Sequence, residues 1–174
     1  MTDDYFVMHF MDGAPLPGPH PYDPNNLHVT FLAYLHMEPE DNKGLEALHE
    51  GLKEISSVLT EFKLKLGPVK MFGLNNNIPV RACEESSRAA ELHVLMLQLA
   101  QKNGFLLSQQ QFTDENFKPH VTFNASNNRY VTGDEFTVNS FTLVRHQNGL
   151  GNGPVQVVDS YPLRSFSSTF AEFF

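Results

Sequence analysis

The sequence of 174 residues lacks tryptophan and contains a single cysteine, Cys83. One cysteine excludes an internal disulfide framework and is typical of a protein from a reducing compartment. We expect Cys83 to be a small buried residue of the core. Hydrophobic residues make up 41% of the chain and include 15 phenylalanines. The sequence therefore predicts a sizeable core whose aromatic part is mainly phenylalanine.

Long apolar runs and basic residues are also scarce. No run approaches the roughly 20 residues that span a bilayer, and the acidic first 13 residues carry no signal pattern. Lysine and arginine number 12 against 20 aspartates and glutamates, for a net charge of −8. This balance argues against binding to long duplex nucleic acid, which needs a basic surface, but allows a small anion in a local pocket. We expect a soluble, cytoplasmic monomer with no membrane partner.

One four-residue phrase, HVTF, occurs twice, at residues 28–31 and 120–123. A single H-x-T is expected by chance about 0.4 times in a chain of this composition, so one copy would be weak evidence. Two identical copies, each inside a strand-like run, favour a shared functional site. Because side chains alternate across a strand, each copy directs its histidine and threonine one way and its valine and phenylalanine the other. The apolar pair would face a core and the polar pair a cleft.

The rest of the chain alternates between strand and helix patterns. Apolar residues at three- and four-residue steps predict helices over 43–60 and 87–103. The proline-rich segment 11–26 is interpreted as a long loop without regular structure. Strands are predicted at residues 4–10, 27–35, 61–67, 69–73, 78–83, 105–112, 120–123, 135–146 and 155–166. The order predicts an α+β fold of one bilobal domain over 1–174, with two antiparallel sheets and outer helices around a central cleft.

Two imidazoles facing one cleft suit general acid–base catalysis. The reference pKa of histidine, about 6.5, lets one ring act as base and the other as acid near neutral pH. His28 and His120 would take and give the protons of an attack at phosphorus, and Thr30 and Thr122 would donate hydrogen bonds to the non-bridging oxygens. No metal or other cofactor is needed in this scheme.

Three rival chemistries have weaker support in the sequence. Histidine is a good zinc ligand, but threonine is not, and neither H-E-x-x-H nor a paired-cysteine spacing occurs. The chain also lacks the G-x-S-x-G elbow of many serine hydrolases and the glycine-rich loop that binds ATP phosphates. A metal-dependent hydrolase, and a nucleotide-binding module without turnover, stay open as alternatives.

The paired motifs resemble those of the 2H phosphoesterase superfamily, which includes 2′–5′ RNA ligase-like and cyclic phosphodiesterase proteins and is defined by two H-x-[ST] motifs. The likeness covers roughly residues 27–166 and includes the Pro-His pair of FKPHVTF and the GPVKMFG stretch. It implies metal-independent hydrolysis or ligation of 2′,3′-cyclic phosphates, 2′–5′ linkages or related (oligo)nucleotides. His28 and His120 would be the catalytic pair, with Thr30 and Thr122 as phosphate contacts.

The chain departs from the family pattern at two places. Ala33-Tyr34-Leu35 stands where many relatives have F-L-G, and Ala125 stands where many have an arginine. We therefore interpret Tyr22, Lys118 and Arg145 as candidate substrate-binding residues in place of the missing contacts.

Overall fold

The computed structural model describes residues 3–20, 26–37, 42–84, 86–107, 117–123, 128–147 and 155–166. Tyr22 and Ala125 lie outside these ranges, as do the side chain of His20 and most of the strand expected at 105–112. The elements are β1 (Asp3–Phe10), β2 (Gly18–His20), β3 (His28–Met37), α1 (Asn42–Val58), β4 (Phe62–Phe72), β5 (Ile78–Glu84), α2 (Ser87–Lys102), β6 (Leu106–Leu107), β7 (His120–Thr122), β8 (Glu135–Val138), β9 (Ser140–His146) and β10 (Val155–Pro162).

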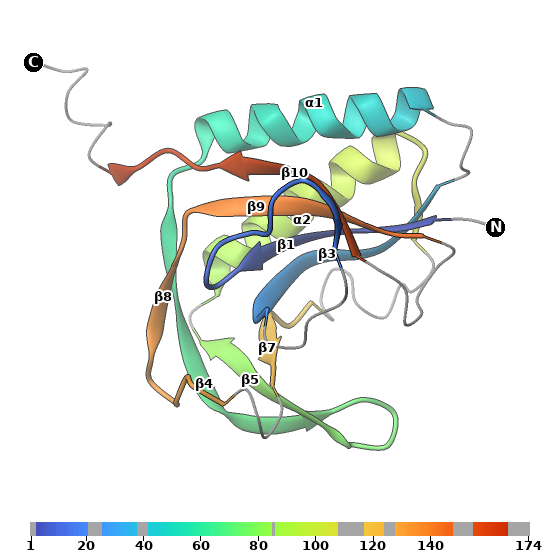
Figure 1. Ribbon diagram of the computed structural model, residues 1–174. Coiled ribbons are helices and arrows are strands. Elements are labelled where there is room, and N and C mark those ends of the chain that lie inside the picture. Colours follow the sequence, from blue (N-terminus) through green and yellow to red (C-terminus); the bar gives the residue numbers. More distant parts are fainter. Residues whose placement is uncertain are drawn as a thin grey trace, which may run out of the picture.

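The strands pair antiparallel in the order β2-β10-β9-β1-β3-β7-β5-β4-β8, with β6 pairing to β3. The α+β class and the antiparallel pairing predicted from the sequence are thus confirmed. The two halves do not form separate sheets, however, because β3 and β7 hydrogen-bond to each other. Figure 1 shows the result: β10, β9, β1 and β3 lie beneath α1, and β7, β5 and β4 continue below them.

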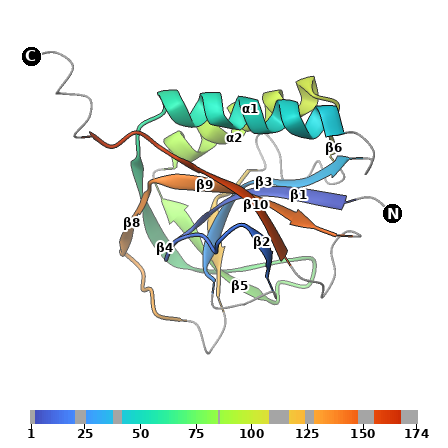
Figure 2. The same ribbon diagram turned by 45° about the horizontal axis from the view of Figure 1, so that its top comes forward.

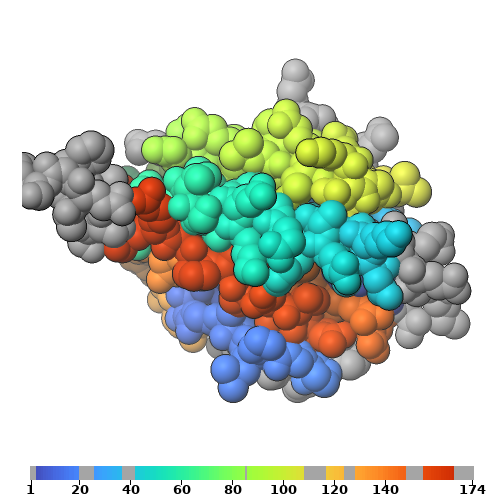
Figure 3. Space-filling view, turned by 90° about the horizontal axis from the view of Figure 1, so that it is seen from above, coloured from blue at the N-terminus to red at the C-terminus, as the bar shows by residue number. Residues whose placement is uncertain are grey.

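Both helices cover the same half of the sheet, so the helices do not flank both halves. Figure 2 shows α1 and α2 together above β3, β1, β9 and β10. From above, the two helices lie side by side with β10 next to α1 (Figure 3). The apolar stripe predicted for α1 packs against the core: Leu48 and Leu52 have no exposed surface, and Leu45 and Ile55 are partly buried. No described helix is long and apolar enough to cross a membrane.

Strand β1 separates two groups of buried side chains. Tyr5 and Val7 belong to the main core, between the sheet and the helices. Phe6, Met8 and Phe10 point to the other face, where they pack with Val144 of β9 in a smaller cluster. Because alternate residues of a strand face opposite ways, the two clusters show which face each residue of β1 occupies. Residues paired with β1 on the adjacent strands share the face of their partner. We call the face of the smaller cluster the outer face.

Three sequence-based predictions of local structure are wrong. The strand expected over 135–146 is two strands, because β8 pairs with β4 whereas β9 pairs with β1 and β10. The loop expected over 11–26 contains the short strand β2, which pairs with β10 at the edge of the sheet. The two strands expected at 61–67 and 69–73 form one strand, β4, because Gly67-Pro68 makes a bulge and not a turn. Leu66 lies opposite Cys83 and Val69 opposite Arg81, so two residues of β4 face one residue of β5. Such a bulge bends a strand without ending it, and Figure 1 shows β4 descending and then turning along the bottom.

A second irregularity lies in β3, at the stretch where the sequence departs from the pattern of the family it resembles. Val7 pairs with Leu32, and Tyr5 pairs with Leu35, so β3 carries an extra residue between them. Tyr34 has a φ of 57°, a conformation uncommon for an aromatic residue. Its ring packs against Phe6 with centroids 5.1 Å apart. The bulge thus directs an aromatic ring onto the outer face.

We expect Gly67→Ala to destabilise the protein. A Cβ at this position would lie 2.9 Å from the carbonyl oxygen of Ala82, a backbone atom of the paired strand that cannot move without disturbing β5. Overpacking of this kind typically costs about 1–3 kcal/mol. Thermal and urea unfolding would measure the loss, with the exposed Lys65→Ala on the same strand as control. Equal stability of the two variants would show that the bulge absorbs the added methyl group.

Candidate active site

The two HVTF phrases lie side by side, as the sequence predicted. Val29 of β3 is directly opposite Val121 of β7, and both are buried, with 0% and 3% of their surface exposed. The alternation of side chains therefore places the four polar residues of the motifs on the opposite face, which is the outer face. These four residues are His28, Thr30, His120 and Thr122. The first three are half-buried, and Thr122 is exposed.

The antiparallel register alternates imidazole and hydroxyl groups. Counting one residue away from the Val29–Val121 pair in each direction, His28 lies opposite Thr122, and Thr30 lies opposite His120. Each ring thus has one threonine two residues away on its own strand and another across the strand pair. A group held between the rings would meet hydroxyl donors from both strands.

Both histidines are held by the same local contact. Nδ1 of His28 donates to the carbonyl oxygen of Asn26 at 3.0 Å, and Nδ1 of His120 donates to the carbonyl oxygen of Lys118 at 2.7 Å. A carbonyl oxygen can only accept, so Nδ1 carries the proton in each ring. In the neutral ring Nε2 is then left with a free lone pair. Two rings with the same tether and the same exposed nitrogen are suited to exchange protons with a bound molecule.

Burial lowers the pKa of both imidazoles below the ordinary value of 6.5. For His28 the hydrogen bond to Asn26 opposes this effect, and the nearby His120 and His146 add to it. For His120 the hydrogen bond to Lys118 is the opposing contribution. Loss of water disfavours the charged ring. At pH 7 the neutral form of each ring therefore predominates.

Aromatic side chains supply part of this burial. Phe10 of β1 packs on His28 with ring centroids 5.8 Å apart. Phe72, at the end of β4, meets the ring of His120 edge-on at 4.9 Å. The contact with Phe72 is notable because β5 lies between β4 and β7 in the sheet. The bend of β4 brings its last residues over the motif.

A third histidine on the outer face was missed in the sequence. His146 of β9 lies opposite Asp4 of β1, and its ring packs against Phe6 at 4.8 Å. Burial lowers the pKa of His146, and Asp4 partly offsets this. Asp4 also pairs with His36 of β3. The alternation of side chains along residues 140–146 would place His146 on the outer face once the face of one residue in that strand is known.

Arg145, the residue before His146, lies on the other face of the sheet. Arg145 lies opposite Tyr5, which belongs to the main core, and its Nε donates to the carboxylate of Asp3 at 2.7 Å. It therefore points away from the four motif residues. Lys118 is exposed, and its backbone carbonyl is the acceptor for His120. Tyr22 lies outside the described residues, so its role as a substrate contact stays a prediction.

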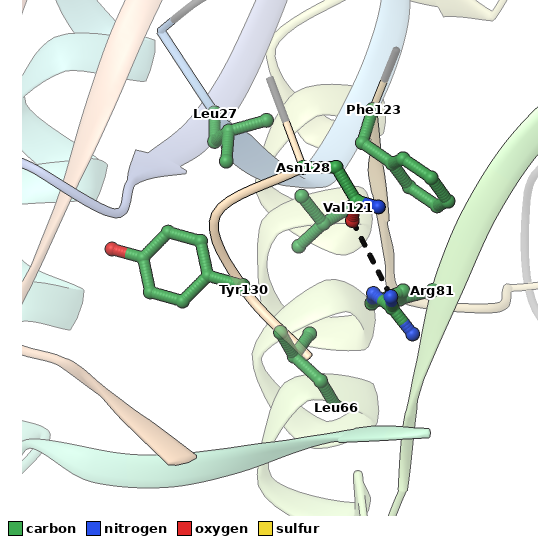
Figure 4. A pocket seen from close by; sticks show the side chains of 7 residues that line it. All are labelled: Leu27, Leu66, Arg81, Val121, Phe123, Asn128 and Tyr130. Carbon is green, nitrogen blue, oxygen red and sulfur yellow. Dashed lines mark hydrogen bonds between the residues drawn. The ribbon is translucent and has the colours of Figure 1, made fainter. Parts of the chain in front are cut away.

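Behind the second motif, a small pocket opens beside the buried Arg81 of β5, with Leu27, Leu66, Val121, Phe123, Asn128 and Tyr130 around it (Figure 4). Arg81 lies opposite Val121 and donates to Thr132 at 2.8 Å and to Asn128 at 3.4 Å. Its guanidinium lies 5.1 Å from the ring centroid of Phe123. Arg81 thus ties the end of β7 to the segment that leads into β8.

Cys83 of β5 and Lys63 of β4 carry reactive groups outside the two motifs. Cys83 is buried, as predicted, and burial raises the pKa of its thiol to about 12, so the thiol stays protonated. Lys63 pairs with Glu135 at 3.8 Å on an exposed part of the sheet. Within the described ranges, no three His, Cys, Asp or Glu side chains are grouped so that they could hold a metal ion.

Solved structures with this arrangement of elements include phosphoesterases. LigT of Escherichia coli, in complex with 3′-AMP, superposes with a TM-score of 0.64 at 18% sequence identity, over 94% of this chain and 99% of LigT. A protein described as a phosphoesterase superposes with a TM-score of 0.64 at 17% identity, over 94% and 99% of the two chains. The chain has the fold of these phosphoesterases. A protein of Thermus thermophilus is similar at 22% identity and a TM-score of 0.62, over 94% and 99% of the two chains.

The comparison confirms the fold that the resemblance of the two H-x-T motifs implied. Neither a protein-family model nor a curated protein matches the sequence. The likeness is therefore structural and shows the fold alone.

We expect the imidazoles of His28 and His120 to titrate below pH 6.5, and Phe72→Ala to raise the pKa of His120 towards that value. Removing the phenyl ring admits water to His120, which stabilises its charged form. Titration followed by NMR of the ring protons would measure both values. His9, which packs on Phe136 and whose pKa burial also lowers, serves as the internal control. If the pKa of His120 is the same in the wild type and in the variant, residues other than Phe72 cause its low value.

Proposed function

We propose that this protein is a metal-independent phosphodiesterase. Its substrate would be a 2′,3′-cyclic phosphate, a 2′–5′ linkage or a cyclic (oligo)nucleotide. The observation that carries the proposal is the pair of tethered histidines: both rings donate Nδ1–H to a backbone carbonyl two residues earlier in the chain. Each therefore presents Nε2 to the same face, where the threonines of both motifs also lie. This is the arrangement that two-histidine acid–base catalysis requires.

In the proposed reaction, Nε2 of one neutral ring removes a proton from the attacking water or hydroxyl. The oxygen of this nucleophile bonds to phosphorus, and the bond from phosphorus to the leaving oxygen breaks. The second ring, protonated at the start, gives the proton of its Nε2 to the leaving oxygen. Protons and electrons balance without a metal ion, and the polarity of the substrate decides which histidine is the base.

Thr30 and Thr122 supply the remaining contacts in this scheme. Their hydroxyls donate to the non-bridging oxygens of the phosphorus centre, where negative charge is held in the transition state. Donors that are already oriented stabilise that charge without reorganisation. A nucleotide as the substrate is supported by LigT, whose structures contain 3′-AMP, ATP or NADP+.

We expect His28→Ala and His120→Ala each to lower turnover by about 10²–10⁴-fold, because each removes one of the two proton-transfer groups. The assay would offer 2′,3′-cyclic nucleotides, 2′–5′ dinucleotides and cyclic dinucleotides in excess chelator. His49→Gln is a matched control, because His49 lies on α1 and bonds to Tyr161, away from the outer face. Full activity in either alanine variant would refute the proposed pair.

The same assay separates the alternatives. Turnover by the wild type that disappears with chelator would favour a metal-dependent hydrolase. Saturable binding of 3′-AMP with no turnover of any substrate would favour a nucleotide-binding module.

We expect kcat/KM to follow a bell-shaped pH profile with its optimum below pH 6.5. The active form needs one ring neutral and one protonated, so its population is greatest midway between the two pKa values. Burial lowers both values below 6.5, which moves the optimum to the acidic side of the ordinary histidine value. Initial rates between pH 4 and 9 would test this. An optimum above pH 7 would contradict the assignment of both proton-transfer roles to these rings.

A further inference from the structure

The end of β4 reaches the four motif residues although it is two strands away from β7. The bulge at Gly67-Pro68 turns the strand, and the rings of Phe72 and His120 pack in a T-shaped arrangement with their centroids 4.9 Å apart. This contact establishes which face of the hairpin β4–β5 belongs to the site. Residues of β4 that share a face with Phe72 therefore face the motifs.

Lys70 is such a residue. It lies opposite Val80 of β5, and Val80 lies opposite Thr122 of β7. The three residues form one row across neighbouring strands, on one face of the sheet. With strands about 4.8 Å apart, the Cα atoms of Lys70 and Thr122 are about 10 Å apart. The four-carbon stem of a lysine can bring its ammonium group across Val80 towards a group held beside Thr122.

The charge of Lys70 is not used by the described part of the protein. Its side chain is exposed, and no carboxylate of the described residues lies within ion-pair distance of it. The lysines of β4 that precede the bulge differ in this respect: Lys63 pairs with Glu135, and Lys65 lies opposite both Glu84 and Glu135. In a chain with a net charge of −8, an unpaired cation beside the motifs is suited to an anionic ligand.

We propose that Lys70 binds a phosphate group of the substrate and that the hairpin β4–β5 is the recognition arm of the site. This inference rests on the proposed function, because it assigns the ligand of the same four motif residues. It adds a cation to a site whose motifs supply only imidazoles and hydroxyls. It also predicts that ligands are selected for a phosphate on the Thr122 side of the histidine pair.

Binding of 3′-AMP and of adenosine to the intact protein, measured by calorimetry at low and high salt, would test the role of Lys70. We expect Lys70→Ala to weaken 3′-AMP binding by about tenfold or more, because hydrogen bonds to charged groups are the stronger ones. Lys70→Arg should keep most of the affinity, and adenosine should bind equally to all variants. Lys65→Ala is the matched control: the same substitution on the same strand, before the bulge.

Activity gives an independent measure. In Lys70→Ala we expect KM to rise by about tenfold with kcat changed by less than threefold, since the residue binds the phosphate and transfers no proton. Because Lys70 is exposed, its replacement should leave the unfolding temperature unchanged, and this would be checked first. Unchanged affinity and KM in Lys70→Ala, an equal loss in Lys65→Ala, or an equal loss for adenosine would overturn the proposal.

The two proposals fail in different ways. Binding of 3′-AMP that depends on Lys70, without turnover of any substrate, would refute the enzymatic function and keep the phosphate contact. Turnover that depends on both histidines but not on Lys70 would refute the phosphate contact and keep the enzymatic function. A wild-type protein that neither binds 3′-AMP nor turns over a substrate would refute both.

Discussion

The antiparallel contact between β3 and β7 is the interaction on which the rest of the structure depends. It joins the half of the sheet that carries both helices to the half built from β7, β5, β4 and β8. Its centre is the pair of buried valines, Val29 and Val121. The same pairing fixes the face and spacing of the motif residues, because the period of a strand is two and a slip of one residue would turn every side chain over. Core and site are therefore specified by one register.

Burial explains why the site is chemically distinct from the rest of an acidic surface. Phe10 and Phe72 lie against the two imidazoles and keep water from one side of each ring. The backbone carbonyls of Asn26 and Lys118 accept a hydrogen bond from Nδ1 of His28 and of His120, respectively. Neither arrangement depends on the net charge of the chain. An acidic protein can therefore carry a site for an anion, provided that the donors and a cation are local.

Much of this architecture was predicted from the sequence because it rests on local periodicity. The stripe of leucines in α1 and the alternation in HVTF are both set by residues a few positions apart. The bulge at Gly67-Pro68 was misinterpreted as a turn, because a Gly-Pro pair favours both and the partner strand decides between them. The faces of Arg145 and His146 could not be predicted from the sequence for a similar reason: the face of a strand residue follows from its neighbours across the sheet. The single bilobal domain and the contact of Tyr22 stay predictions.

The identical tethers of the two histidines have a consequence for the direction of the proposed chemistry. After one turnover the ring that began neutral is protonated, and the ring that began protonated is neutral. Since the protein holds both rings in the same way, this state is the mirror of the starting state. It is ready for the reverse reaction, or for a substrate bound the other way round, without first exchanging a proton with solvent. Asymmetry in such a site has to come from what lies around the pair, such as the packing of Phe72 from the hairpin β4–β5 against His120.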